Sequence, residues 1–383
     1  MSRTFLVAFL LLLFSGIFLL ATCIPEPAAQ VERVRVDSAP IPQMTLSPEQ
    51  DALEARLAEI GEGFPGVVGI GVAEESSEAV MGYNGDVPMP QQSVSKLWVS
   101  MTALDLVDQG KLNLAEPVVI RAQDLTLFHQ PIREIVKAKG QFLTTYRELM
   151  ERAITQSDNT ANDRILRRAG GPGAVEKFIA KNHLQGVAFG TDERTKQAAI
   201  AGLEWQPSYS IGRRFYEARE AVPDERRKAA FEGYLADPID GATPAGMAEA
   251  LAKLARGDLL SKSSTELLVG IMNKTKSGPR RLKGGVPPDW AIAHKTGTGQ
   301  VYAGEQSGYN DVAILFSPTG RKYGVAVFIQ RTRSSYPERF AMMQAVTKAV
   351  VAYDEALVSG SATVSVPEPT SLPRPQTAST PPS

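Results

Sequence analysis

The chain has few of the residues on which disulfide, metal and nucleic-acid chemistry depend. Only one of its 383 residues is a cysteine, Cys23, so no disulfide can form within the chain. The three histidines, His129, His183 and His294, are scattered, and no HExxH or CxxC pattern occurs, so we expect no metal and no cofactor. A formal net charge of -1 leaves no basic excess for binding phosphates, so we expect no nucleic-acid partner.

An apolar run at the N-terminus predicts export. Residues 5–21 are almost wholly apolar and follow Arg3, as in a secretory signal covering residues 1–23. Cys23 stands where a bacterial lipoprotein signal places its lipidated cysteine, although Thr22 occupies a position that usually holds a smaller residue. A plain cleaved signal and an uncleaved membrane anchor are the alternatives. We expect a periplasmic protein, attached to the membrane through Cys23 if that residue is lipidated.

Two segments rich in proline bound a single folded domain. Residues 24–46 contain four prolines and little periodicity, which indicates an extended linker. Residues 357–383, rich in Ser, Thr and Pro, predict a disordered tail. The domain between them, residues 47–356, is expected to be a monomer. The whole chain is 43% hydrophobic and 22% charged, which is ample for a large core.

The pattern of the domain predicts an α/β layer with an inserted all-α subdomain. A helix is expected over 47–60, where Leu53, Leu57 and Ile60 form one stripe. The middle of the chain, about 92–275, is almost all helical. Near the two ends of the domain, apolar and β-branched runs predict two hairpins of an antiparallel sheet of about five strands, closed by a last helix. The strands of the hairpins are expected at 67–73, 79–83, 311–316 and 323–330, and the helix at 337–353.

The first of three short motifs, Ser93-Val94-Ser95-Lys96, supplies a nucleophile and a base. Ser93 and Lys96 are three positions apart, so both lie on one side of the first turn of a helix. Lys96 can accept the hydroxyl proton if burial or neighbouring positive charge favours its neutral form. The ordinary alternative is an N-cap serine followed by a solvated lysine.

The second motif, Ser157-Asp158-Asn159, ends a deeply packed helix predicted over 145–156. At the mouth of a cleft, Ser157 can relay a proton to a leaving group and Asn159 can bond a substrate amide. Asp158 is better suited to tying the loop together. An Asx-type helix stop is the alternative for the motif taken alone.

The third motif is Lys295-Thr296-Gly297 followed by Thr298, at the end of a strand predicted over 290–294. A strand edge of small residues can pair with an extended substrate and hold its carboxylate against Lys295 and Thr296. The competing Lys276-Ser277-Gly278 precedes a proline and predicts a loop. We expect His294 to be a structural neighbour rather than a base, because no GxSxG motif or acidic partner accompanies it.

In this order the motifs resemble those of the class A β-lactamases and related penicillin-binding proteins. The resemblance extends to Gly69–Ala73, to Ser157–Ala161 with the following Gly170-Gly171-Pro172, and to Asp240–Pro244, which is similar to the end of the family's omega loop. It implies that Ser93 is the nucleophile, Lys96 the proton acceptor and Ser157 a proton relay. It also implies that Lys295, Thr296 and Thr298 contact substrate, with an oxyanion hole made by the backbone N–H groups of Ser93 and Thr298.

One departure concerns the glutamate that activates water for deacylation in that family. The segment between Pro172 and Asp240 is longer than usual, and no Glu is followed four residues later by Asn. Glu193, Glu204 and Glu217 are candidates, with surface charge as the default for all three. The extra stretch, about 195–236, contains Trp205, Tyr209 and Phe215, and we expect it to form a lid over the cleft.

Three functions are therefore compatible with the sequence. The first is hydrolysis of β-lactams through an acyl ester of Ser93. The second is a peptidoglycan D,D-peptidase acting on D-Ala-D-Ala peptides, favoured by the missing Glu-Asn pair. The third is a tethered, non-catalytic binder of cell-wall fragments, against which the intact motifs argue.

Overall fold

The computed structural model describes residues 46–364, with side chains described as far as residue 360. The predicted signal, Cys23 and nearly all of the predicted linker lie outside the described residues. No helix in the described part is long and apolar enough to cross a membrane.

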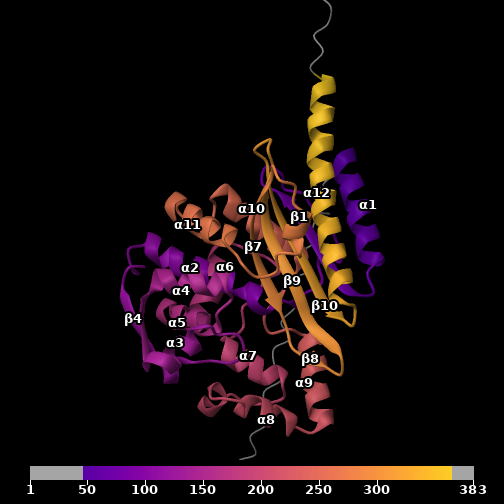
Figure 1. Ribbon diagram of the computed structural model, residues 1–383. Coiled ribbons are helices and arrows are strands. Elements are labelled where there is room, and N and C mark those ends of the chain that lie inside the picture. Colours follow the sequence, from indigo (N-terminus) through magenta and orange to yellow (C-terminus); the bar gives the residue numbers. More distant parts are fainter. Residues whose placement is uncertain (1–45, 365–383) are drawn as a thin grey trace, which may run out of the picture. The chain divides into compact units, whose positions relative to one another are not determined.

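A single antiparallel sheet forms the centre of the described chain, as predicted (Figure 1). Its strands lie in the order β2-β1-β10-β9-β7, and the short β8 pairs with β9. The expected hairpins are both present, because β1 pairs with β2 and β9 with β10. The strands of this sheet are β1 (Gly66–Glu74), β2 (Val80–Tyr83), β7 (Ala291–Thr298), β8 (Val301–Tyr302), β9 (Glu305–Phe316) and β10 (Lys322–Thr332).

Side chains of the central strands alternate between two cores, one on each face of the sheet. On β10, Val325 and Val327 join the cluster under the terminal helices, whereas Ala326 and Phe328 join the cluster under the inserted subdomain. This is the period of two that a strand imposes. Both faces are buried, which is why these strands are continuously apolar in the sequence.

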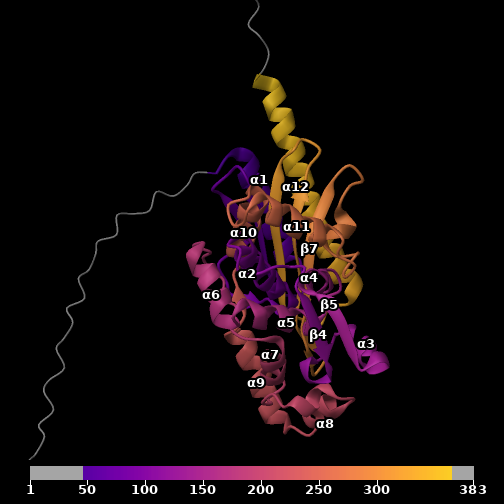
Figure 2. The same cartoon turned by 90° about the vertical axis from the view of Figure 1, so that its left-hand side faces the viewer.

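Two terminal helices, α1 (Pro48–Glu62) and α12 (Tyr336–Val364), cover one face of the sheet and lie side by side (Figures 1 and 2). Ser47 caps α1 in a capping box, in which its hydroxyl accepts from the backbone of Gln50 and the Gln50 side chain accepts in return. The predicted last helix was too short: α12 continues past 353 to Val364. The predicted tail is therefore helical over 357–364.

The other face of the sheet carries the all-α subdomain, whose centre is α2. Every residue of α2 from Lys96 to Leu104 is buried, so this part of the helix is surrounded on every side. Two short strand pairs accompany the helices. The elements are β3 (Met89–Pro90), α2 (Lys96–Asp108), β4 (Pro117–Arg121), α3 (Ile132–Lys139), β5 (Gln141–Thr145), α4 (Tyr146–Thr155), α5 (Asn159–Ala169), α6 (Pro172–Lys181), β6 (Gly241–Ala242), α10 (Pro244–Arg256) and α11 (Lys262–Asn273).

The long segment before Asp240 folds as three further helices at one end of the molecule (Figure 1). They are α7 (Glu193–Ile200), α8 (Arg214–Glu220) and α9 (Asp224–Ala236), the last being the helix predicted after Pro223. A small hydrophobic cluster that includes Tyr209 and Phe215 holds α7 and α8 together and joins them to Leu127 of the helical subdomain. The expected lid is thus a compact helical insertion.

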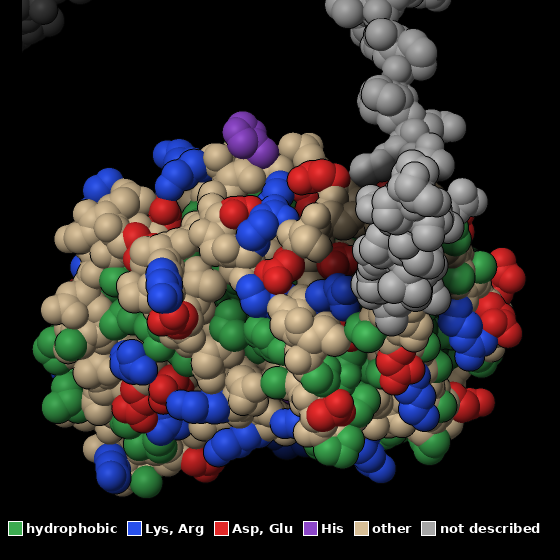
Figure 3. All heavy atoms as spheres, turned by 90° about the horizontal axis from the view of Figure 1, so that it is seen from above, with side chains coloured by type: hydrophobic (Ala, Val, Ile, Leu, Met, Phe, Trp, Pro, Cys, Tyr) green, Lys and Arg blue, Asp and Glu red, His purple; other side chains and the backbone are tan. Residues whose placement is uncertain are grey.

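The surface at the opposite end, seen in Figure 3, mixes charges of both signs. Basic and acidic side chains alternate across this face and neither sign forms a continuous area. Exposed charges of the described chain also pair at short range, as Lys181 does with Asp105 and Arg256 with Asp258. Such exposed pairs contribute little to stability.

Candidate active site

Ser93 lies in a tight turn rather than in the first turn of an α-helix. The turn η1 (Gln92–Ser95) is a 3-10 helix, and α2 begins at Lys96. Gln92 adopts a left-handed backbone with φ 54°, which is unusual for a residue other than glycine. Its backbone N–H donates to Asp240 Oδ2 at 2.9 Å, so a distant carboxylate stabilises the strained residue beside Ser93.

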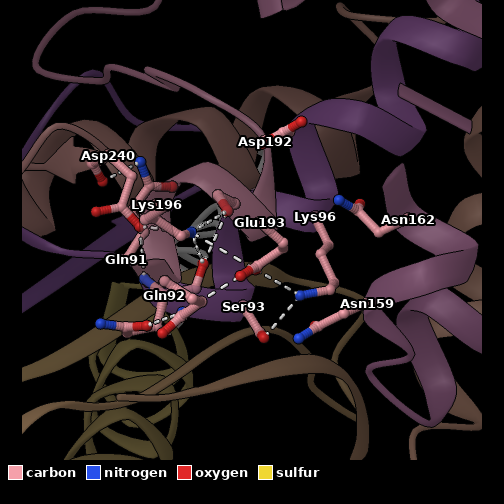
Figure 4. Close-up of polar contacts among 12 residues, drawn as sticks. Gln91, Gln92, Ser93, Lys96, Asn159, Asn162, Asp192, Glu193, Lys196 and Asp240 are labelled. Carbon is pink, nitrogen blue, oxygen red and sulfur yellow. Dashed lines mark hydrogen bonds and ion pairs between the residues drawn. The ribbon is translucent and has the colours of Figure 1, made fainter. Parts of the chain in front are cut away.

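Lys96 joins Ser93 to a carboxylate, as Figure 4 shows. Its Nζ lies 2.7 Å from Ser93 Oγ and 2.7 Å from Glu193 Oε1. The lysine is fully buried. Burial, with help from the charge of Lys196, lowers the pKa of Lys96, although Glu193 opposes this shift. A lysine with a lowered pKa next to a serine hydroxyl is equipped to take its proton.

Glu193 is buried and shared by two lysines. Lys196 Nζ lies 3.5 Å from Glu193 Oε1 and 2.9 Å from Asp240 Oδ2. Burial alone would raise the pKa of Glu193, but Lys196 and Lys96 outweigh it and hold that pKa well below its usual range. Glu193 is therefore an ionised carboxylate with acceptor capacity at neutral pH.

On the opposite wall, Lys295 contacts Ser157. Lys295 Nζ donates to Ser157 Oγ at 3.0 Å and to the carbonyl oxygen of Thr296 at 2.8 Å. Ser157 has φ 59°, a second left-handed residue beside the cleft. Burial, followed by the charges of Lys96 and Arg281, holds the pKa of Lys295 well below its usual value. The structure thus brings together the first, second and third motifs.

Strand β7 presents the rest of the third motif, and packing explains its glycine. A Cβ on Gly297 would lie 2.4 Å from the carbonyl oxygen of Gln91, so the strand can approach the Ser93 turn only with glycine here. Arg281 donates to the carbonyl oxygen of Gly297 at 2.9 Å and to Thr298 Oγ1 at 2.7 Å. The competing motif lies alongside, with Ser277 Oγ 2.7 Å from Thr296 Oγ1.

Asp158 ties the loop together, as predicted, and Asn159 begins the helix that follows it. Asp158 accepts the backbone N–H of Ala161 at 3.0 Å and that of Ile132 at 2.8 Å, so it caps α5 and ties in a neighbouring segment. Asn159 donates one amide hydrogen to the carbonyl oxygen of Leu127 at 3.0 Å. Binding of a substrate amide by Asn159 stays a prediction.

His294 does have an acidic partner, contrary to the expectation from sequence. Its Nδ1 lies 3.0 Å from Asp311 Oδ1, and both side chains are fully buried. Alternation along β7 places His294 on the face with Ile292, under the terminal helices, and Lys295 on the face with Ala293. The pair therefore lies on the other side of the sheet from Ser93.

Among the three candidate glutamates, the structure brings only Glu193 to the described motifs. Glu204 and Glu217 are exposed, whereas Glu193 is 3% exposed, so surface charge was the wrong default for it. Gln197 stands four residues after Glu193, where the family pattern has Asn. Its Nε2 lies 3.2 Å from Glu193 Oε2. The spacing of four is therefore present in the sequence, with Gln in place of Asn.

Three other residues of the site were missed. Lys196 and Asp240 form a buried ion pair 44 positions apart, and Asp163 accepts the backbone N–H of Glu193 at 3.3 Å. Burial, with the charges of Asp192 and Glu193, raises the pKa of Asp163 to about 6. Asp163 lies four residues after Asn159, one helical turn on, which is the only local signal for it.

The fold and the site define a class: an antiparallel sheet with an inserted helical subdomain and a serine–lysine pair at their junction. Residues 52–354 match the model of the Beta-lactamase enzyme family, and the chain belongs to this family. It is 28% identical over 309 residues to the extended-spectrum beta-lactamase PER-1 of Pseudomonas aeruginosa, covering 80% of this chain and 89% of that protein.

Two solved structures share the fold. The crystal structure of a beta-lactamase from Chitinophaga pinensis is 26% identical, with a TM-score of 0.64 over 80% of this chain and 99% of that one. An ancestral class A beta-lactamase is 30% identical, with a TM-score of 0.61 over 78% of this chain and 99% of that one. These relatives confirm the fold and the family predicted from the motifs.

Proposed function

We propose that the protein hydrolyses β-lactams through an acyl ester of Ser93. The observation that carries the proposal is the position of Lys96 Nζ, 2.7 Å from both Ser93 Oγ and Glu193 Oε1. The names of the relatives, which are beta-lactamases, support the choice of substrate class.

Acylation uses Lys96 as the proton acceptor. As the Ser93 oxygen bonds to the β-lactam carbonyl carbon, its proton passes to neutral Lys96, and the ring C–N bond breaks. Ser157, contacted by Lys295, relays this proton from Lys96 to the released nitrogen, so Lys96 is neutral again once the acyl ester has formed. The backbone N–H groups of Ser93 and Thr298 stabilise the oxyanion, while Lys295 and Thr296 bind the substrate carboxylate.

Deacylation uses Glu193. A water molecule loses its proton to the ionised carboxylate as its oxygen attacks the ester carbonyl. This proton then passes from Glu193 through Lys96 to the oxygen of Ser93 as the ester bond breaks. Both oxygens of Glu193 are within hydrogen-bonding distance of nitrogen donors, Oε1 of Lys96 and Oε2 of Gln197, which fix the plane of the carboxylate.

The buried Glu193 also bears on the alternative function. The D,D-peptidase was favoured by the missing deacylation glutamate, and Glu193 beside Lys96 removes that reason.

A chromogenic cephalosporin, followed by absorbance and by intact mass, tests the proposal. Catalytic colour development that is abolished in Ser93→Ala is the expected result. A stable mass increase at Ser93 without turnover would replace hydrolysis by acylation alone, and release of D-alanine from a D-Ala-D-Ala peptide would favour the peptidase. Absence of any adduct would contradict the proposal and leave the binder.

The role of Glu193 is tested separately with Glu193→Gln, which keeps the shape of the side chain but removes its charge. We expect breakdown of the acyl-enzyme to slow by about a hundredfold or more, and its formation to change less. An unchanged lifetime of the acyl-enzyme would contradict the assignment.

For localisation we propose export to the periplasm with attachment through lipidated Cys23. The support is the apolar run over 5–21 followed by Cys23. Metabolic labelling with a fatty-acid analogue should label the full chain and not Cys23→Ser. Equal labelling of the two would contradict lipidation.

A further inference from the structure

The helical insertion contacts both walls of the cleft. On the subdomain side, the ring of Phe215 packs edge-on against Phe128 at 5.1 Å, and Phe128 follows Leu127, whose carbonyl holds Asn159. On the sheet side, Arg219 Nη1 donates to Gln300 Oε1 at 3.3 Å, just beyond the end of β7. The insertion therefore spans the two elements between which a substrate has to lie.

A chain of hydrogen bonds continues from Arg219 to the carboxylate of Glu193. Gln300 Nε2 donates to Gln197 Oε1 at 3.0 Å and to the backbone oxygen of Gln197 at 2.8 Å. Gln197 Nε2 donates in turn to Glu193 Oε2 at 3.2 Å and to Gln92 Oε1 at 2.9 Å. Four side chains from three separate parts of the sequence thus form one polar line.

The donor at one end of this chain of hydrogen bonds and the acceptor at the other end determine the orientation of both amides between them. A guanidinium can only donate hydrogen bonds, and an ionised carboxylate can only accept them. Each primary amide between them must therefore turn its oxygen toward Arg219 and its nitrogen toward Glu193. Reversing either amide would place two donors or two acceptors against each other, and a buried amide is costly to leave unpaired.

The two oxygens of Glu193 are not equivalent in this arrangement. Oε1 is contacted by Lys96 at 2.7 Å and by Lys196 at 3.5 Å. Oε2 has its hydrogen bond from Gln197. A carboxylate oxygen can accept about two hydrogen bonds, so Oε2 is the oxygen with room for a water proton. Its direction depends on how Gln197 is oriented.

We propose that Arg219 and Gln300 are positioning residues for deacylation: they orient Gln197, which in turn directs Glu193 Oε2 toward the hydrolytic water. The insertion then has a function in the reaction beyond covering the cleft, because α8 supplies the guanidinium at the start of the line. This inference rests on the proposed role of Glu193 as the base.

The guanidinium of Arg219 is held where the proposal needs it. It lies over the rings of Tyr216 at 5.4 Å and Phe215 at 5.9 Å, the same aromatic cluster that contacts Phe128. Arg213, the N-cap residue of α8, also lies over Tyr216, at 5.7 Å, but it is exposed and has no hydrogen bond to Gln300. Arg213 is therefore a matched control.

The test separates formation from breakdown of the acyl-enzyme by time-resolved intact mass with one cephalosporin. In Arg219→Met and Gln300→Met we expect breakdown to slow by about threefold to tenfold, because each substitution breaks the partly buried hydrogen bonds that lead to Gln197. Formation should change less than about twofold. Arg213→Met should match the unaltered protein. Unchanged breakdown in both Arg219→Met and Gln300→Met would overturn the proposal, as would equal slowing in Arg213→Met.

Gln300→Glu distinguishes orientation from simple attachment of the insertion. A glutamate at 300 still accepts from Arg219, and more strongly, but it has no hydrogen to donate to Gln197. The proposal expects breakdown as slow as in Gln300→Met; breakdown at the rate of the unaltered protein would overturn it. If Glu193→Gln slows breakdown while these variants do not, only this inference fails, whereas an unaffected Glu193→Gln removes the proposed base itself.

Discussion

Two buried lysines contact the same carboxylate, yet the pKa of each is shifted in the opposite direction. Lys96 and Lys196 are both almost completely buried, and both lie within 3.5 Å of Glu193 Oε1. Burial lowers the pKa of Lys96, and the opposing attraction of the Glu193 charge does not restore it. Burial acts on Lys196 too, but Asp240 together with Glu193 raises its pKa above the ordinary value.

The difference is the number of carboxylates available to each amine. Lys196 lies between two of them and so is a permanent cation that holds Glu193 to Asp240. Lys96 contacts one carboxylate and a serine hydroxyl, and the positive charge of Lys196 disfavours the protonated form of Lys96. One cluster therefore contains a structural cation and an amine suited to exchanging protons.

Removing the exchanging amine should have the largest effect. In Lys96→Met we expect acylation by a cephalosporin to slow on the order of a thousandfold, because Ser93 loses its proton acceptor. Stopped-flow absorbance or intact mass measures the rate, and thermal unfolding serves as the control for folding. Acylation within tenfold of the original rate would remove the distinction between the two lysines.

Removing the structural cation should instead be seen in stability. Lys196→Met leaves Asp240 buried without its cation, and breaking a buried pair in this way costs about 3–5 kcal/mol of unfolding free energy. Urea denaturation measures the loss. Lys262→Met is the matched control, since Lys262 is exposed and its contact with Glu266 is 3.9 Å long; there we expect less than about 1 kcal/mol. Equal losses would show that burial of the pair is unimportant.

Asp163, a carboxylate beside the cluster without a lysine, extends the comparison. Its pKa is raised to about 6, so ionisation above that pH destabilises the fold, and unfolding free energy should fall as pH rises from 4 to 7. Asp163→Asn should therefore be more stable at pH 7.5, by up to about 3 kcal/mol, with the advantage disappearing near pH 4. Denaturation at several pH values measures this. A constant difference across that range would contradict the raised pKa.

The smallest effect concerns how Glu193 acts on Lys96. Glu193 favours the protonated form of Lys96, so its neutralisation in Glu193→Gln should lower the pKa of Lys96 further. The pH at which acylation reaches half its maximum should then move down by about one unit. Single-turnover acylation rates between pH 5 and pH 10 measure the shift. An upward shift would mean that Glu193, rather than Lys96, receives the serine proton.

Features with a local physical cause were predicted well from the sequence. The capped helix over 48–62, the hairpins and the strand before Lys295 follow from periodicity and turn residues. Ser93 and Lys96 are three residues apart, which is enough to place them on one side of a turn. The end of α12 was placed too early, because its last turns have the composition of a linker rather than of an amphipathic helix.

The sequence by itself thus determined the sheet, the family and which serine stands beside which lysine, since each follows from spacings of a few residues. Only the tertiary structure decided that Glu193 lies 97 positions from the lysine it contacts, that Lys196 pairs with Asp240, and that Arg219 reaches Gln300. Contacts between distant segments depend on how long loops close, and loop closure leaves no periodic trace in a sequence.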